Sequence, residues 1–360
     1  MNNATIAAVF HDPGSPIEFR EVALPALRGS EILVEVVACT LCGSDLHSLH
    51  GRRSVPTPTI LGHEILGRIA EFGPKASRRD ERGRPLSVGD RVTWGVVASC
   101  GDCFYCRRRL PQKCERGTKY GHEPVRPDRE LTGGLAGYCV LVPGSAIFLV
   151  PDHLSDAVAC PANCATATVA SAMDAAGPLA GARVLVMGAG MLGLTATAWA
   201  RSLGAEAVIA CDADPARLTP TESFGASRSA SPEAVAEAVL DCTEGYGVDV
   251  AFELTGAPDA IEAALPLVRV GGVLILIGSV CPTRAVPVVP EQIVRRCLTV
   301  RGIHNYRPRD LEAALDFLGS ASSFPFDSLV SEWQPLSALE SIRRDRATHD
   351  KRRIGIRPGG

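Results

Sequence analysis

The sequence lacks an excess of charge of either sign, since 37 basic and 40 acidic side chains leave a formal net charge of -3. This balance gives no electrostatic reason to expect nucleic acid or an anionic membrane as a partner, although local basic clusters could bind an anionic substrate. No apolar run approaches the ~20 residues that cross a bilayer, because Gly, Pro or charged residues interrupt each run. The first residues lack the basic start and apolar stretch of a secretion signal. We therefore expect a cytoplasmic protein that binds neither membrane nor nucleic acid.

The composition is typical of a globular chain with more than one core. Of the 360 residues, 46% are hydrophobic and 21% are charged, and this length favours two domains. In the first third, short β-branched runs such as residues 31–38 and 138–145 alternate with Gly and Pro turns. This pattern predicts an irregular all-β barrel or sandwich over residues 1–165.

The pattern changes near Pro161. An apolar, strand-like run at 182–187 precedes a glycine loop and an Ala-rich helical stretch at 192–203, and further apolar strands alternate with helices. Strands that are apolar at every position, with helices between them, indicate an α/β fold with a doubly wound parallel sheet covered on both faces. We expect this domain over 166–302, and we expect 303–360, too short to fold alone, to return to the first domain.

The 13 cysteines are an odd number and are too clustered for a disulfide framework, so in a reducing compartment they indicate metal. Four follow the spacing C-x2-C-x2-C-x7-C, namely Cys100, Cys103, Cys106 and Cys114. Four thiolates at this spacing can close a tetrahedron around zinc and leave no position for substrate, which predicts a structural zinc site. An iron–sulfur cluster is the alternative, but its bacterial spacing ends with a gap of about three residues followed by Pro.

A second set of metal-binding side chains lies upstream. The strings CGSDLH and GHE supply a thiolate, two imidazoles, a hydroxyl and two carboxylates. A catalytic zinc needs about three protein ligands and one open position. We predict Cys42 and His63 as two ligands, and Cys164 as the third because it lies where the two domains should meet. Glu64 is either a direct ligand when substrate is absent or a group that supports the ligands.

The glycine loop GAGMLG lies between a predicted strand and a predicted helix, the context in which this pattern binds a dinucleotide. The helix N-terminus would face the pyrophosphate, and the residues expected there are Gly188, Gly190, Met191, Leu192 and Gly193. Asp212 ends the next strand, where a carboxylate can bind the adenosine ribose and repel the additional phosphate of NADP. We therefore predict NAD as the cofactor. Arg217 is either a ribose or adenine contact or a solvated helix residue.

These motifs together resemble those of the zinc-dependent medium-chain dehydrogenase/reductase family, typified by alcohol, sorbitol and threonine dehydrogenases. The resemblance covers essentially the whole chain, in the order CGSDLH, GHE, GDRV, the four-cysteine cluster, PANCATATV and the glycine loop. It implies a GroES-like β-rich catalytic domain with both zinc sites, a Rossmann domain, and NAD-linked interconversion of an alcohol with an aldehyde or ketone. It also implies a homodimer or homotetramer joined through the sheet domain, with residues 298–303 as a candidate contact.

The resemblance also implies roles for single residues. Asp45 would support the zinc-bound histidine, while Ser44 and His47 would relay the alcohol proton to solvent. Cys164 as third ligand is similar to the alcohol dehydrogenase pattern, whereas many polyol dehydrogenases use Glu. Further residues expected at the cofactor are Thr168, Thr255, Gly278 and Ser279. His304 and Asn305 either flank the nicotinamide end or pack in the core or at an interface.

The substrate pocket is poorly specified by the sequence. The strings WGVVASCGDCFYC, LPQKCERGTKYGHE and CPANCATATV are similar to a branch of the family associated with phosphonate metabolism, which implies a phosphonate-bearing alcohol or aldehyde. Possible partners for such an anion, each of which could also be an ordinary solvated side chain, are Arg52, Arg53, Lys119 and His122. A polyol, sugar or amino-alcohol dehydrogenase is the second hypothesis. A dinucleotide sensor without catalysis is a third, but it would not need an open zinc site.

Overall fold

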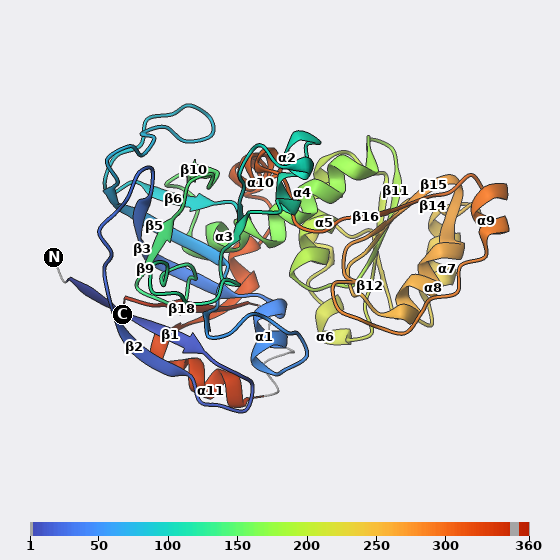
Figure 1. Ribbon diagram of the computed structural model, residues 1–360. Helices are drawn as coiled ribbons and strands as arrows, with labels where there is room; N and C mark the ends of the chain where they lie inside the picture. The colour runs from blue at the N-terminus through green and yellow to red at the C-terminus, as the bar shows by residue number, and fades with distance from the viewer. Residues whose placement is uncertain (1–2, 346–352, 360) are drawn as a thin grey trace. The chain divides into compact units, whose positions relative to one another are not determined.

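The computed structural model describes residues 3–345 and 353–359, which form two compact units (Figure 1). The first unit comprises Met1–Cys164, Arg307–Gly319 and Phe326–Gly360, and the second comprises Ala165–Tyr306 and Ser320–Pro325. The sequence predicts that the second domain ends at residue 302, whereas the second unit continues to Tyr306. Strand β16 ends at Gly302, and the turn that follows it, which includes Asn305 with a φ of 56°, belongs to the same unit. Residues 346–352 and 360 of the expected C-terminal return lie outside the described residues.

The first unit is built mainly on antiparallel strands, and in its largest sheet β17 pairs parallel with β18. Its largest sheet has the order β10-β6-β5-β3-β18-β17 with β9 also paired to β3, and smaller sheets have the orders β2-β1-β4 and β7-β8. The strands are β1 (Ala4–Phe10), β2 (Glu18–Ala23), β3 (Ile32–Leu41), β4 (Thr59–Ile60), β5 (Glu64–Phe72), β6 (Arg91–Trp94), β7 (Val97–Ala98), β8 (Thr118–Lys119), β9 (Tyr138–Leu141), β10 (Ile147–Leu149), β17 (Val330–Pro335) and β18 (Arg353–Arg357). Its helices are α1 (Gly43–Leu49), α2 (Phe104–Arg107), α3 (Asp156–Ala159), α10 (Pro308–Ser320) and α11 (Leu339–Arg344).

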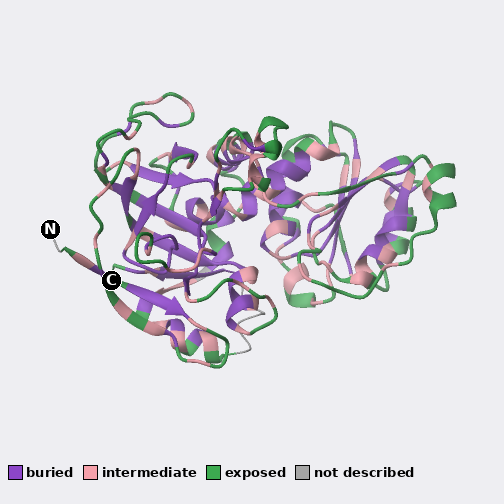
Figure 2. Ribbon diagram, viewed as in Figure 1, coloured by how far each residue is buried: buried purple, intermediate pink, exposed green. Residues whose placement is uncertain are grey.

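Strand β3 is central because nearly all of its side chains, ILVEVVACTL, are apolar and only Glu35 is exposed. It pairs antiparallel with β5, placing Thr40 opposite Glu64, and with β18, placing Leu41 opposite Ile354. The end of β3 and the starts of β5 and β18 therefore lie side by side at the same end of the sheet. Figure 2 shows that these strands are mostly buried.

The second unit contains a six-stranded parallel sheet with the order β13-β12-β11-β14-β15-β16. Its strands are β11 (Arg183–Met187), β12 (Ala207–Cys211), β13 (Arg228–Ala230), β14 (Val248–Glu253), β15 (Val268–Leu276) and β16 (Thr299–Gly302). Its helices are α4 (Ala165–Ala176), α5 (Met191–Ser202), α6 (Pro215–Leu218), α7 (Val235–Cys242), α8 (Pro258–Leu267) and α9 (Pro290–Arg295).

The order of this parallel sheet reverses between β11 and β14, and ligands of open α/β sheets bind at such a switch point. The interior of the unit is apolar, with Leu185, Ile209, Ala251 and Leu274 buried on four adjacent strands. Helix α9, unlike these buried strands, is mostly exposed, as Figure 2 shows. Among residues 3–345 and 353–359, no helix is long and apolar enough to span a bilayer.

Candidate active site and metal centres

Cys42 lies between the end of β3 and the start of α1, where Asp45 holds the turn. The backbone N–H of Cys42 donates to Asp45 Oδ2 at 3.0 Å, and the backbone N–H of Asp45 donates to the Cys42 carbonyl at 3.0 Å. Asp45 therefore satisfies a backbone group at the helix N-terminus, the end at which a carboxylate is stabilising. The thiol of Cys42, 9% exposed, is fixed beside this turn.

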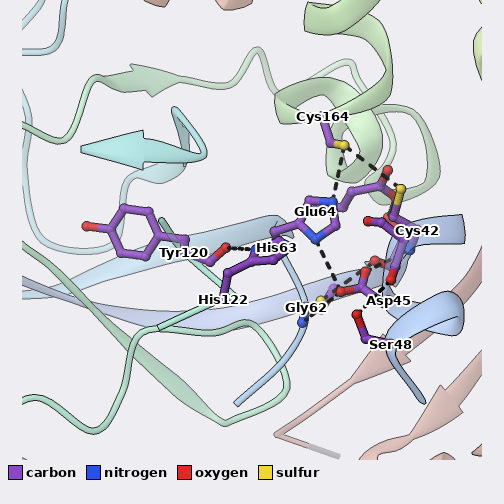
Figure 3. A network of polar contacts seen from close by, with 12 residues as sticks. Cys42, Asp45, Ser48, Gly62, His63, Glu64, Tyr120, His122 and Cys164 are labelled. Atoms are coloured by element: carbon purple, nitrogen blue, oxygen red, sulfur yellow. Dashed lines mark hydrogen bonds and ion pairs between the residues drawn. The ribbon is translucent and has the colours of Figure 1, made fainter. Parts of the chain in front are cut away.

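His63 is oriented by the same carboxylate. Its Nδ1 lies 3.2 Å from Asp45 Oδ1, which also accepts from the backbone N–H of Gly62 at 3.3 Å. A carboxylate on Nδ1 favours the proton there and leaves Nε2 available as a metal ligand. This Nε2 lies 3.2 Å from Cys164 Sγ (Figure 3).

Cys164 reaches His63 through its neighbour Asn163, whose side chain is fully buried. The Asn163 amide donates to the carbonyls of His63 and Trp94 at 3.1 and 2.9 Å, and its Oδ1 accepts from the backbone N–H of Ile65 at 3.3 Å. These three bonds attach the segment before α4 to the start of β5. Cys164 Sγ consequently lies 4.0 Å from Cys42 Sγ, although the residues are 122 positions apart.

Glu64 is engaged by a residue that sequence reasoning missed. Arg353, at the start of β18, donates from Nε and Nη2 to the Glu64 carboxylate at 2.9 to 3.2 Å, and from Nη2 to Cys42 Sγ at 3.4 Å. Thr40 Oγ1 also donates to Glu64 at 2.6 Å. A buried carboxylate requires a partner, but no motif indicates which arginine supplies it.

The charges of this group perturb one another. A hydrogen bond with Cys164 and the charge of Arg353 hold the pKa of Cys42 well below its usual range, and the same hydrogen bond raises the pKa of Cys164. Burial lowers the pKa of His63, but Asp45 and Cys42 outweigh it and raise that pKa to about 10. Burial raises the pKa of Glu64 to about 7 against the opposing charge of Arg353.

These side chains form a donor set suited to zinc. One atom each of Cys42, His63, Glu64 and Cys164 lies within 4.8 Å of the other three, in a largely buried group. Thiolate sulfur and imidazole nitrogen are the ligands that zinc prefers, and a mixed set of three with an exchangeable fourth is typical of catalytic sites. The Glu64 carboxylate, one of the four candidate ligands, is already paired with Arg353.

The four-cysteine cluster forms a second, separate donor set of Cys100, Cys103, Cys106 and Cys114. Cys100 and Cys106 lie 4.0 Å apart at sulfur, and so do Cys103 and Cys114. A tetrahedral zinc with Zn–S bonds of ~2.3 Å requires sulfur separations of about 3.8 Å, so the spacing fits. Arg116 donates to Cys100 Sγ at 3.4 Å, and this contact would offset the negative charge of four thiolates.

The glycine loop connects β11 to α5 at the switch point of the sheet. A Cβ added to Gly193 would lie 1.7 Å from the Gly188 carbonyl, so only glycine permits this approach of helix and loop. Gly190 is the extended residue before α5, and a Cβ there would meet nothing within 4 Å. Met191 and Leu192 form the first turn of the helix.

The other predicted cofactor residues, among them Asp212, lie on several elements of the second unit. Asp212 directly follows β12, and its carboxylate accepts backbone N–H groups of Ala189 and Asp214 at 2.7 and 2.9 Å. It is therefore attached to the glycine loop. The remaining residues lie after β14 (Thr255), after β15 (Gly278 and Ser279), on α6 (Arg217, paired with Asp214), on α4 (Thr168) and after β16 (His304 and Asn305).

The predicted relay and anion-binding residues belong to the first unit. Ser44 and His47 lie on α1, and burial lowers the pKa of His47. Arg53 and His122 are in contact, since Arg53 Nη1 lies 2.8 Å from His122 Nε2. Lys119 ends β8 and is partly buried, whereas Arg52 is exposed. The structure thus brings three of the four predicted anion contacts into one region.

A buried mixed-donor metal group, a four-thiol cluster and a dinucleotide-type sheet define a class, the zinc- and nicotinamide-dependent oxidoreductases. Comparison with known proteins agrees. The alcohol dehydrogenase GroES-like domain model matches residues 28–152, and the zinc-binding dehydrogenase model matches residues 192–320. The chain is 31% identical over 313 residues to the L-threonine 3-dehydrogenase of Pyrococcus horikoshii, with 84% of each chain covered.

Solved structures are similar over the full length. An alcohol dehydrogenase of Thermotoga maritima matches with a TM-score of 0.92, 29% identity and 99% coverage of each chain. A zinc-binding dehydrogenase of Sinorhizobium meliloti 1021 bound to NADP matches with a TM-score of 0.86, 26% identity and 99% coverage of each. The chain belongs to the zinc-dependent medium-chain dehydrogenase/reductase family, which confirms the expected fold class and reaction on CH–OH donors. The phosphonate substrate stays a prediction.

Proposed function

We propose that this enzyme interconverts an alcohol and an aldehyde or ketone with NAD at a catalytic zinc held by Cys42, His63 and Cys164, while the four-cysteine cluster holds a structural zinc. The observation that carries the proposal is the donor set itself, four ligand atoms within 4.8 Å of one another. When bound, zinc supplies Lewis acidity that stabilises negative charge on an alcohol oxygen, and NAD supplies the hydride acceptor.

The chain's own residues hold the ligands and move the proton. Asp45 holds the Nδ1 proton of His63, and the proton that the raised pKa of His63 keeps on Nε2 would be displaced when zinc binds. Arg353 donates to the Glu64 carboxylate and to Cys42 Sγ, so its cation favours the charged form of both groups. Ser44 Oγ accepts the alcohol proton and passes it to the His47 ring, from which it leaves to solvent.

The choice of NAD follows from Asp212. A carboxylate at the end of β12 suits the ribose hydroxyls and repels the additional phosphate of NADP. Because the S. meliloti relative is bound to NADP, the preference for NAD is tested by comparing turnover with the two cofactors. Thr168, Arg217, Thr255, Gly278 and Ser279 are the further proposed cofactor contacts.

The enzyme is proposed to work in the cytoplasm, where reducing conditions keep metal-binding thiols available. It is proposed to form a homodimer or homotetramer through β16, the exposed edge of the parallel sheet. A phosphonate-bearing alcohol is the proposed substrate. A polyol or amino-alcohol is the second candidate, favoured by the similarity to an L-threonine 3-dehydrogenase.

Metal analysis and a coupled absorbance assay test the function. The protein as purified should contain two zinc ions per chain, and NADH should form from at least one member of a panel of simple, polyhydric, amino and phosphonate alcohols. NADP should be used less efficiently than NAD. Absence of zinc-dependent alcohol oxidation with either cofactor across the panel would overturn the proposal.

A further inference from the structure

Two cations of the first unit meet at His122, since Arg53 Nη1 lies 2.8 Å from His122 Nε2 and the His122 backbone N–H donates to the Lys119 carbonyl at 3.0 Å. Arg53 and Lys119, named here the basic pair, are both partly buried. Burial and the neighbouring charge of Arg53 lower the pKa of Lys119. Among residues 3–345 and 353–359, no carboxylate forms an ion pair with either side chain. Glu123, the nearby acid, accepts from the Lys119 backbone N–H at 2.9 Å. Cations held together in this way are costly unless an anion joins them.

His122 fixes where the Arg53 guanidinium points. Its Nδ1 lies 3.0 Å from the Tyr120 carbonyl, which can only accept, so Nδ1 carries the proton. Its Nε2 lies 2.8 Å from Arg53 Nη1, which can only donate, so Nε2 accepts. Both contacts are satisfied only by neutral His122, which is 8% exposed. Arg53 uses one N–H on this ring and keeps its other donors for a ligand.

The segment that carries His122 packs directly on the predicted metal ligand His63. The two imidazole rings have centroids 5.0 Å apart. Gly121, with φ of 72°, lets the two backbones meet, since a Cβ there would lie 2.6 Å from the Gly62 carbonyl. The His122 imidazole thus contacts the Arg53 guanidinium and also packs beside the His63 ring.

Arg53 is held from its own side by the end of α1. The backbone N–H groups of Arg52 and Arg53 both donate to the His47 carbonyl, at 2.8 and 3.2 Å. The side chains of the basic pair thus come from two segments that are each tied to the candidate active site. Arg52, in contrast, is exposed.

We propose that the basic pair binds the anionic group of the alcohol substrate, a phosphonate or phosphate dianion a few bonds from the reacting carbon. This specificity rests on the proposed dehydrogenase function. Two cations match a dianion better than a carboxylate, and a guanidinium binds phosphoryl oxygens in pairs. His122 is a positioning residue that acts through Arg53.

Matched alcohols test the substrate class in the zinc-loaded enzyme with NAD. We compare 2-hydroxyethylphosphonate and 2-hydroxyethyl phosphate with 3-hydroxypropanoate and with the neutral dimethyl ester of 2-hydroxyethylphosphonate. The dianions should have the highest kcat/KM, and comparison of the first two separates phosphonate from phosphate. Equal rates on the dianions and the neutral ester, or a preference for the ester, would overturn the proposal.

Charge-removing variants locate the subsite. Arg53→Gln and Lys119→Gln should each lower the ratio of kcat/KM for the dianion to that for the neutral ester by about 10- to 100-fold, the effect of one hydrogen bond to a charged group. Arg126→Gln, which removes an equal charge from an exposed site four residues beyond His122, should leave the ratio unchanged. Equal losses on both substrates would mean that the basic pair has only a structural role.

The positioning role of His122 has its own readout. His122→Leu removes the acceptor for Arg53, and it should raise KM for the dianion more than it lowers kcat. His122→Gln, whose Oε1 can accept from Arg53, should restore part of the KM. If His122→Leu also lowers kcat and raises KM for the neutral ester, and His122→Gln restores neither value, positioning through Arg53 is contradicted.

Binding of methylphosphonate separates failure of the subsite from failure of the dehydrogenase assignment. Calorimetric titration with saturating NAD, which blocks the cofactor site, should give saturable binding that Arg53→Gln weakens. The basic pair should bind methylphosphonate even if the enzyme oxidises no alcohol. In that case the proposed dehydrogenase reaction would be wrong, and the anion subsite would stand. Oxidation of neutral alcohols without methylphosphonate binding would overturn the basic pair alone.

Discussion

At the residue scale, Cys42 and Cys103 should respond differently to the loss of a thiol. Cys42→Ser removes a ligand from the buried mixed-donor group and should lower turnover by about 100-fold or more, beyond the usual loss from a supporting group. NADH binding, measured by fluorescence titration, should be retained. Cys103→Ser should instead reduce zinc from two ions to one per chain and lower the unfolding temperature.

Cys281→Ser supplies the control for both variants, since this partly buried cysteine belongs to neither donor set. It should change neither zinc content nor turnover. Unchanged turnover in Cys42→Ser would contradict the catalytic assignment, and unchanged zinc content in Cys103→Ser would contradict the structural one.

Arg353 and Glu64 form a buried ion pair in which each charge depends on the other. Arg353→Met leaves a carboxylate buried without its cation, and removing one partner from such a pair costs about 3–5 kcal/mol of stability. Urea denaturation followed by tryptophan fluorescence measures the loss. Arg344→Met breaks the Glu340 pair, whose arginine side chain is 69% exposed, and should cost less than about 1 kcal/mol. Similar losses in the two variants would argue against a special role for Arg353.

The metal-binding residues could be predicted from the sequence, whereas the partner of Glu64 could not. The donor strings around Cys42, His63 and Cys164 contain the ligand chemistry itself, so the sequence could identify the set that the fold brings together. Arg353 lies 289 residues from Glu64 and carries no motif. It could be found only from the antiparallel pairing of β18 with β3, which no short-range pattern indicates.

At the scale of elements, the two glycines around the start of α5 should separate folding from cofactor binding. Gly193→Ala would place a Cβ 1.7 Å from the Gly188 carbonyl, so helix and loop must move apart and the unfolding temperature should fall. Gly190→Ala has open space and should fold normally. It should nevertheless weaken NADH binding, since a Cβ there hinders the approach of the pyrophosphate.

Differential scanning fluorimetry and NADH titration on both variants test this separation. Gly359→Ala, a position with open space and no positive φ, supplies the control. Normal NADH binding in Gly190→Ala would mean that the cofactor does not approach the loop closely.

Elements were also predictable to different degrees. The apolar run before the glycine loop and the Ala-rich run after it correspond to β11 and α5 within one residue at each end, because both periodicities are strong. The charge-rich segment at 77–85 contains a buried residue with a partner far away in the sequence. Asp80 is buried and binds Arg84, and it also accepts from the Leu149 backbone N–H at 3.3 Å. Such a partner from a distant strand is invisible to local charge patterns.

At the scale of the whole molecule, the sequence could predict a β-rich part and a parallel-sheet part from their textures. It could not predict that residues 320–325 belong to the second unit while the chain on either side belongs to the first. That placement depends on tertiary packing rather than on composition. One example is Phe324, whose ring lies 3.4 Å from the position of a Cβ on Gly225.

The subunits of the proposed oligomer would pair through strand β16. Strand β16 lies at the edge of the parallel sheet with all four residues exposed, and an open edge invites pairing with a second copy. Val300→Lys places like charges opposite each other in such a pair and should convert the oligomer to monomers in sedimentation velocity. Leu240→Lys, a similarly exposed position on α7, should leave the oligomer intact. An oligomer that persists in Val300→Lys would exclude pairing through β16.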